Sequence, residues 1–160
     1  MHVVTPLELD AVSFAYPGGP PVLGEVTLTV SEGEFVGIAG PNGGGKTTLL
    51  RLALGLEEPT GGEVRLFGRR PGARGGPRVG YLPQRARVSS GAPVTVAEIV
   101  AAGRLAVRGP IGPLRGRDRV VIDDAIARVG LSHLTHAPLR TLSGGLQQRA
   151  FIAKALATEP

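Results

Sequence analysis

The sequence predicts an α/β fold in which strands fill the first half of the chain and helices fill the second half. Three observations predict this fold. Two segments of alternating apolar and polar residues, separated by a turn rich in Pro and Gly, open the chain, and further predicted strands follow up to Gln84. A glycine-rich loop stands between a short apolar run and a helical pattern. Beyond Gln84, apolar residues recur at the spacing of a helix.

The elements follow in order along the chain. Alternation predicts antiparallel strands at 7–14 and 22–30, on either side of the Pro/Gly turn that begins at Tyr16. The mostly apolar run at 34–39 is typical of a strand that is covered on both faces. Thr95 and Glu98 form a predicted capping box. The remaining predictions are a helix at 46–56, strands at 63–67 and 78–82, a helix from Thr95 to about Gly103, a loop at 105–116, and helices at 118–129 and 146–157.

Composition excludes several classes of protein. The 160 residues are 42% hydrophobic and 19% charged, as in a globular domain, and contain no cysteine. Disulfide scaffolds and Cys-ligated metal sites are therefore excluded. The sequence shows neither a membrane-spanning apolar run nor a secretory signal, so we expect a cytoplasmic protein. The net charge is +5, but the arginines are scattered, which favours a solvated surface and no nucleic-acid partner.

The segment 40–47 matches the phosphate-binding pattern G-x-x-x-x-G-K-[ST]. Its backbone N–H groups must curl around phosphates, and glycines allow that close approach. The lysine reaches the β- and γ-phosphates, the following threonine ligates Mg²⁺, and the helix start faces the anion with its positive end. The predicted nucleotide-binding residues of this loop are Gly40, Pro41, Asn42, Gly43, Gly44, Gly45, Lys46, Thr47 and Thr48.

This pattern alone does not select one activity. A glycine-rich turn that carries a lysine by chance is the alternative, although a strand before and a helix after the loop favour phosphate binding. GTPases, kinases, helicases and transport ATPases all share the loop. Further motifs must choose among them.

The segment 142–149 makes that choice. A serine followed by two glycines at a helix start is a second anion site, because a hydroxyl and exposed N–H groups can donate to a phosphate. This segment resembles the LSGGQ signature of ABC-type ATPases, with Leu146 where the family usually has Gln. The resemblance implies that Ser143, Gly144 and Gly145 contact ATP held by a second subunit, so that two chains pair head to tail. An ordinary Ser-capped helix is the alternative.

Two more positions are similar to the same family. Tyr16 stands where ABC proteins place the aromatic residue that stacks on adenine, and Gln84 stands where they place a glutamine that contacts Mg²⁺ and the attacking water. The resemblance therefore implies ATP and Mg²⁺ as ligands. It implies Lys46, Gln84 and Ser143 as catalytic residues, and Thr47 and Gln84 as residues that hold the Mg²⁺. Taken alone, Tyr16 would be interpreted as a turn tyrosine at a strand end. For Gln84 the alternative is a surface glutamine, which the family spacing disfavours.

The resemblance also implies how the domain is divided. We expect one partial ABC ATPase domain of the P-loop NTPase class over residues 1–160. Residues 1–84 would form an antiparallel β subdomain with part of a RecA-like core, 85–145 a helical subdomain, and 146–160 a return helix. The chain resembles the N-terminal two-thirds of the family, with the Walker B strand and later core strands missing. The expectation is that this chain alone folds poorly and hydrolyses ATP at background rates.

The segments 79–88, 93–96, 103–104 and 149–157 are similar to the zinc and manganese importer branch. This branch implies membrane-spanning subunits, a second ATPase subunit, an extracytoplasmic metal-binding protein, and a position at the inner face of the cell membrane. Siderophore and haem importers share part of the pattern and are the first alternative. A DNA-maintenance ABC ATPase is a weaker one, because the coiled-coil or zinc-bearing insertion of that class is missing here.

Overall fold

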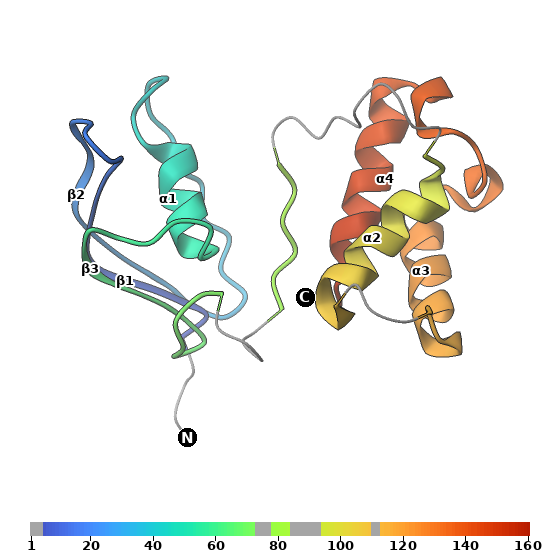
Figure 1. Cartoon of the computed structure of the whole chain (residues 1–160), viewed down its shortest axis with the longest axis horizontal. Helices are drawn as coiled ribbons and strands as arrows, with labels where there is room; N and C mark the ends of the chain where they lie inside the picture. The colour runs from blue at the N-terminus through green and yellow to red at the C-terminus, as the bar shows by residue number, and fades with distance from the viewer. Residues whose placement is uncertain (1–4, 73–77, 84–93, 110–112) are drawn as a thin grey trace. The chain divides into compact units, whose positions relative to one another are not determined.

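The computed structural model describes residues 5–72, 78–83, 94–109 and 113–160. The chain divides into two compact units, Met1–Pro77 and Arg78–Pro160, and each unit has its own hydrophobic core (Figure 1). In the described ranges, no helix combines the length and apolar character that crossing a membrane requires.

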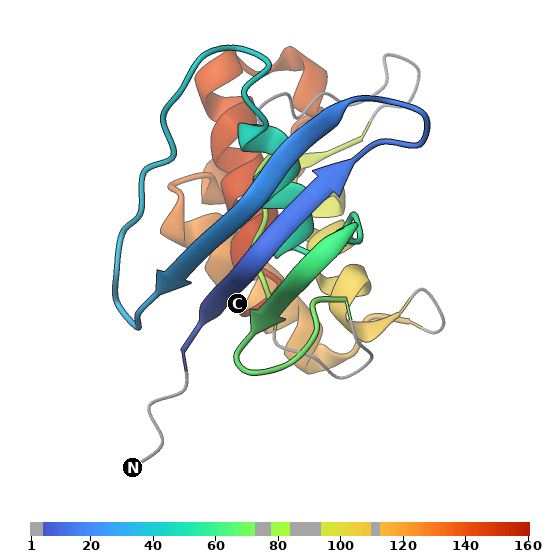
Figure 2. The same cartoon turned by 90° about the vertical axis from the view of Figure 1, so that its left-hand side faces the viewer.

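The N-terminal unit contains a three-stranded antiparallel sheet. Strand β1 (Leu7–Ala15) lies between β2 (Pro21–Val30) and β3 (Gly61–Leu66), as Figure 2 shows. The register pairs Leu9 of β1 with both Leu28 of β2 and Val64 of β3. The strands predicted at 7–14, 22–30 and 63–67 are confirmed within two residues at each end.

One helix, α1 (Lys46–Ala53), packs against this sheet. Its Leu52 is 1% exposed and joins a core with Leu9, Val12, Phe14 and Val64. The predicted helix at 46–56 is confirmed, although it ends three residues earlier. The glycine loop of the N-terminal unit therefore ends beside strand β2 and leads into α1, and the apolar face of α1 anchors that helix on the sheet.

The C-terminal unit is helical. Helices α2 (Val96–Arg108), α3 (Gly116–Arg128) and α4 (Gly144–Leu156) contact one another in all three pairs (Figure 1). Two short 3₁₀ turns, Ser132–Leu134 and Leu139–Thr141, lead into α4. The core between the helices consists of Val96, Val100, Ile122, Ala125, Ile126, Leu131, Leu139, Ala150, Phe151, Ala153 and Ala157.

The start of α2 confirms the predicted capping box. The Glu98 N–H donates to the Thr95 side chain at 3.3 Å, and the Thr95 N–H donates to the Glu98 carboxylate at 2.7 Å. The predicted loop at 105–116 is wrong in its first four residues and its last, because α2 continues through Arg108 and α3 begins at Gly116; residues 110–112 lie outside the described ranges. Leu105 and Ala106 are good helix formers, and the helix ends only at Gly109, whose φ is +90°.

The predicted strands at 34–39 and 78–82 are wrong as hydrogen-bonded strands. Neither segment belongs to the sheet, and their apolar side chains are open to solvent, with Phe35 98% exposed and Tyr81 41% exposed. A strand exists only where a neighbouring strand accepts and donates its backbone hydrogen bonds. Within the described ranges no parallel partner lies beside these runs, so their strand propensity is not realised.

Candidate functional site

The glycine loop folds back on itself before α1. Gly43 and Gly45 have φ values of +83° and +77°, in the left-handed region that favours glycine. The Gly44 N–H donates to the Pro41 carbonyl at 3.1 Å and closes the turn. A Cβ at Gly45 would lie 2.7 Å from Leu23 Cδ2 and 3.1 Å from the Val22 carbonyl oxygen, so these neighbours would have to shift to admit a side chain.

Helix α1 starts directly after this turn and has nothing anionic at its beginning. Gly45 is its N-cap and makes no side-chain hydrogen bond, and the first turn contains no acidic residue. The positive end of the helix dipole is therefore not neutralised by the helix itself. Lys46 Nζ donates to the carbonyls of Gly40 and Pro41, at 2.8 and 2.6 Å, so the ammonium lies over the loop. Thr47 is exposed at the same helix end.

Tyr16 lies beside this helix start. Its hydroxyl is 3.5 Å from Thr48 Oγ1, and Thr48 is buried in the first turn of α1. Tyr16 is 39% exposed, and its ring meets the Phe14 ring edge to face, with centroids 4.8 Å apart. The structure thus brings Tyr16 to the loop that the sequence identified separately. The contacts that hold Tyr16 could not be predicted from the sequence, because the pattern around Phe14 indicates only an inward-facing strand residue.

The second candidate anion site lies at the start of α4. Ser143 is the N-cap of this helix, and its Oγ accepts from the Leu146 N–H at 3.5 Å. Gly144 and Gly145 are exposed, and a Cβ at either position would meet nothing within 4 Å. The first turn of α4 contains no acidic residue. A helix start with an open backbone and a hydroxyl is suited to bind a phosphate.

The predicted site residues fall in different parts of the chain. Tyr16 and the loop from Gly40 to Thr48 belong to the N-terminal unit, and Ser143, Gly144 and Gly145 belong to the C-terminal unit. Gln84 lies outside the described residues.

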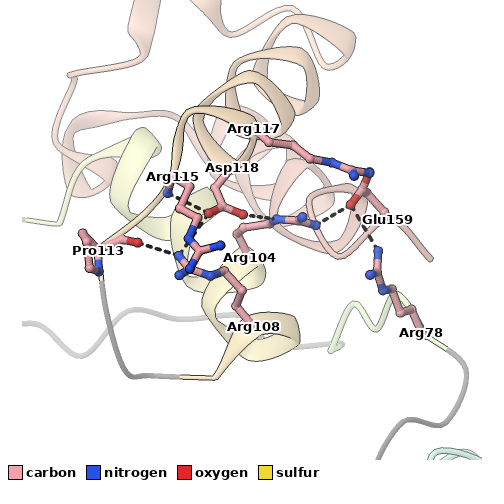
Figure 3. Close-up of polar contacts among 8 residues, drawn as sticks. All are labelled: Arg78, Arg104, Arg108, Pro113, Arg115, Arg117, Asp118 and Glu159. Atoms are coloured by element: carbon pink, nitrogen blue, oxygen red, sulfur yellow. Dashed lines mark hydrogen bonds and ion pairs between the residues drawn. The ribbon is translucent and has the colours of Figure 1, made fainter.

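Sequence reasoning missed a cluster of buried charges in the C-terminal unit (Figure 3). Arg104 is 6% exposed, and its Nε donates to Asp118 Oδ1 at 2.8 Å. Asp118 Oδ2 also accepts from Arg108 and from the Arg115 N–H. The Arg104 guanidinium, followed by the Arg115 N–H, holds the pKa of Asp118 below its usual range. The sequence signal that could have revealed the cluster is a charged residue, such as Arg104 or Asp118, at a helical spacing otherwise occupied by apolar residues.

Comparison with known proteins identifies the family. The model of the family described as ABC transporter matches residues 23–160, and the chain therefore belongs to that family. The resemblance drawn from the motifs is confirmed. A chain of a solved ABC transporter in an inward-facing conformation superimposes with a TM-score of 0.80 at 28% identity, covering 98% of this chain and 57% of that one. The predicted class, an α/β ABC ATPase fold, is confirmed as well.

Three curated relatives show the range of names in the family. The zinc uptake system ATP-binding protein ZurA of Listeria innocua is 36% identical and covers 96% of this chain and 60% of its own length. The manganese transport system ATP-binding protein MntB of Bacillus subtilis is 37% identical, with 94% and 60% covered. The hemin import ATP-binding protein HmuV of Rhodopseudomonas palustris is 42% identical, with 94% and 54% covered. The chain spans about 60% of the length of such relatives.

Proposed function

We propose that the whole protein is the ATP-binding and ATP-hydrolysing subunit of an ABC importer. The observation that carries this proposal is the glycine loop, which folds back and begins a helix with an ammonium over it and no acidic residue in the first turn. Such an arrangement favours a polyanion, because backbone N–H groups, the helix dipole and the lysine all act on the same charge. Family membership supports a nucleotide as that anion.

Within this proposal each site residue has a role. Gly40 to Gly45 would surround the phosphates, Lys46 would reach the β- and γ-phosphates, and Tyr16 would stack on the base. Ser143, with Gly144 and Gly145, would donate to the γ-phosphate of ATP bound by a second chain that is paired head to tail. Lys46, Gln84 and Ser143 would then act on the reacting phosphate, where catalysis depends mostly on positioning and on neutralising charge.

Thr47 and Gln84 would hold the Mg²⁺ that accompanies ATP. The Thr47 hydroxyl fits this role, because it is exposed at the helix start and Mg²⁺ prefers oxygen ligands, most of which the phosphates and water would provide. Bound Mg²⁺ neutralises phosphate charge during phosphoryl transfer.

We also propose that the imported substrate is a metal ion, zinc or manganese. Relatives named for zinc and manganese transport support this assignment. The importer would include membrane-spanning subunits, a second ATPase subunit and an extracytoplasmic metal-binding protein, with this subunit at the inner face of the membrane. A haem or siderophore importer is the second candidate, and the identity with HmuV supports it.

Nucleotide binding is tested with the only two lysines of the chain, Lys46 and Lys154. Mg-ATP is titrated calorimetrically into the chain as it stands and into the variants Lys46→Ala and Lys154→Ala. Both variants lose one positive charge, but only Lys46 lies over the glycine loop. We expect Lys46→Ala to weaken binding by about 100-fold, as the loss of charge-assisted contacts to phosphate does, and Lys154→Ala to bind normally. Equal affinities for both variants would contradict the proposal.

The transported substrate is tested in cells that contain the whole importer. Uptake of zinc, manganese and haem is measured with the intact subunit and with its Lys46→Ala variant. Metal-ion uptake that depends on Lys46 supports the metal importer, and Lys46-dependent haem uptake alone supports the second candidate.

A further inference from the structure

A single buried arginine joins three segments of the C-terminal unit. Arg104 of α2 donates from Nε to Asp118 of α3 at 2.8 Å, and from its NH1 group to Glu159, which follows α4 (Figure 3). The Arg104 side chain is 7% exposed and the Asp118 side chain 5%. A buried guanidinium is tolerated only where carboxylates compensate its lost hydration, so Arg104 fixes both partners.

The backbone of α2 supports this contact. Gly103 lies so close to α4 that a Cβ there would be 2.1 Å from the Lys154 carbonyl oxygen. Only glycine allows the two helices to approach to this distance. The residue that follows, Arg104, therefore reaches the end of α4 from a fixed place on α2.

Glu159 has an unusual backbone conformation. Its φ is +51°, in the left-handed region that non-glycine residues rarely adopt, and it precedes Pro160, which restricts it further. Such a conformation persists only where surrounding contacts enforce it. Besides Arg104, the Glu159 carboxylate contacts Arg78 at 3.1 Å and Arg117 at 3.5 Å. The Arg104 guanidinium lowers the pKa of Glu159 most strongly, so the carboxylate stays charged.

This turn places Glu159 and Pro160 against the segment 78–83. Arg78 donates to the Glu159 carboxylate at 3.1 Å. A Cβ at Gly80 would lie 3.3 Å from Pro160 Cγ and 3.4 Å from the Ala155 carbonyl oxygen. The segment is thus held at two points, by an ion pair and by contact with the last turn of α4.

We propose that Arg104 is a positioning residue that docks the segment 78–83 on the end of α4 by holding Glu159 in its turn. This inference rests on the proposed function for its significance, because 78–83 leads directly to Gln84 and Ser143 caps the start of α4. The 13-residue helix is a rod of about 20 Å. Arg104 therefore couples the backbone that precedes one nucleotide-contacting residue to the helix that presents another.

The coupling needs the geometry of arginine and not only its charge. Arg104 uses two different nitrogens of its planar group for two carboxylates, from Nε to Asp118 and from NH1 to Glu159. A lysine ammonium is a single point charge and cannot reproduce this fixed pair of directions. Arg104→Lys keeps the charge and removes the bridge.

Tyr81 provides a probe of docking. The chain has two tyrosines and no tryptophan, so in a Tyr16→Phe background Tyr81 is the only fluorescent side chain of this type. It lies in the segment 78–83 and is 41% exposed. We measure acrylamide quenching of Tyr81 without nucleotide, in this background and with Arg104→Lys added. Undocking should raise the quenching constant about twofold, as a partly covered side chain opens to solvent.

Arg117→Gln is the matched control. Arg117 contacts the same carboxylate at 3.5 Å, but its side chain is 78% exposed and it belongs to α3, so Tyr81 quenching should stay unchanged. Arg78→Gln should raise quenching, and combining it with Arg104→Lys should add little, because both act through Glu159. Far-UV circular dichroism checks that each variant is folded. If Arg104→Lys does not fold, the comparison of Arg78→Gln with Arg117→Gln carries the test.

The inference is overturned if Tyr81 is quenched equally in the Arg104→Lys and Arg117→Gln variants. If Arg104→Lys does not fold, equal quenching in Arg78→Gln and Arg117→Gln overturns it. Purely additive effects of Arg78→Gln and Arg104→Lys overturn it as well. Mg-ATP titration of the chain with Tyr16 intact tests the proposed function separately. A chain that docks Tyr81 through Arg104 and binds no ATP contradicts the proposed function alone.

Discussion

The two helices that begin at candidate phosphate sites start in opposite ways. Helix α1 is capped by Gly45 in a left-handed conformation with no side-chain hydrogen bond, whereas α4 is capped by Ser143, whose hydroxyl accepts from a first-turn N–H. The start of α1 thus has no capping side chain, whereas the start of α4 is capped by one hydroxyl group. In the first, the unmet donors of the helix end are left for a ligand. In the second, a side chain already satisfies one of them.

The two helix starts should differ most in how a glycine-to-alanine substitution changes the stability of the folded unit. Gly45→Ala forces alanine into φ +77° and places its Cβ 2.7 Å from Leu23 Cδ2. We expect it to destabilise the N-terminal unit by about 2–4 kcal/mol, from left-handed strain and overpacking. Calorimetric titration should show Mg-ATP affinity falling with it, because the loop can no longer close.

Gly144→Ala is the counterpart on α4. Its Cβ meets nothing within 4 Å, and the residue is already helical. Alanine is a better helix former than glycine, so stability should rise by up to about 1 kcal/mol. Thermal unfolding of both variants gives the comparison. A Gly144→Ala variant as unstable as Gly45→Ala would show that the two starts are not built differently.

Acid should affect the two units unequally. Asp118 faces Arg104 and Arg108, and Glu159 faces Arg104, Arg117 and Arg78, and the pKa of each carboxyl is lowered by these partners, most strongly by Arg104. Because the pKa is lowered in the folded state, each carboxylate contributes its full stabilisation at pH values above the ordinary pKa, 3.8 for Asp and 4.5 for Glu. This contribution is lost as the pH falls below those values.

The helical circular dichroism signal comes mostly from the C-terminal unit. Its melting temperature should therefore fall as the pH is lowered from about 5 to about 3. In the N-terminal unit, Arg65 also lowers the pKa of Glu63, but that pair is solvent-exposed and contributes little. Asp118→Asn should be less stable at neutral pH and lose much of this pH dependence. An unchanged pH dependence in Asp118→Asn would show that the cluster is not the acid-sensitive part.

Much of each unit was predictable because the signals are local. Alternation along 7–14 identified β1, and Thr95 with Glu98 identified the start of α2, since each pattern acts within a few residues. The runs at 34–39 and 78–82 are also predicted as strands from local sequence, and they still form no ladder. Their outcome depends on a neighbouring strand, which no property of the run itself can provide.

The site divides in the same way. The glycine loop and the Ser143 cap are local patterns, and the structure shows the conformations that they favour. The contact of Tyr16 with Thr48 and the bridge from Arg104 to Glu159 join residues 32 and 55 positions apart. Composition and spacing do not predict such pairings, because the fold of the intervening chain decides which side chains meet.

Removing the Ser143 hydroxyl should have a smaller effect than changing Gly45. The bond from Leu146 N–H to Ser143 Oγ is long, at 3.5 Å, so Ser143→Ala should destabilise the C-terminal unit by about 0.5–1 kcal/mol. Ser143→Asp separates two roles: a carboxylate caps the helix but repels phosphate. Helix stability should recover in this variant, whereas ATP-dependent pairing of two chains of the whole protein, measured by sedimentation, should not. Recovery of both would contradict a phosphate contact at Ser143.

The smallest expected effect concerns Tyr16, beside the other helix start. Tyr16→Phe removes a hydroxyl whose contact with Thr48 is 3.5 Å long, but keeps the ring and its edge-to-face contact with Phe14. Mg-ATP affinity should change by less than about twofold, because a long hydrogen bond at a part-exposed group contributes little. Tyr16→Ala removes the ring, and the affinity should fall by about 5- to 10-fold if a base stacks there. Inorganic triphosphate has no base, so its affinity should be the same in both variants. If triphosphate binding falls together with ATP binding in Tyr16→Ala, the tyrosine supports the loop at the start of α1 and does not recognise the base.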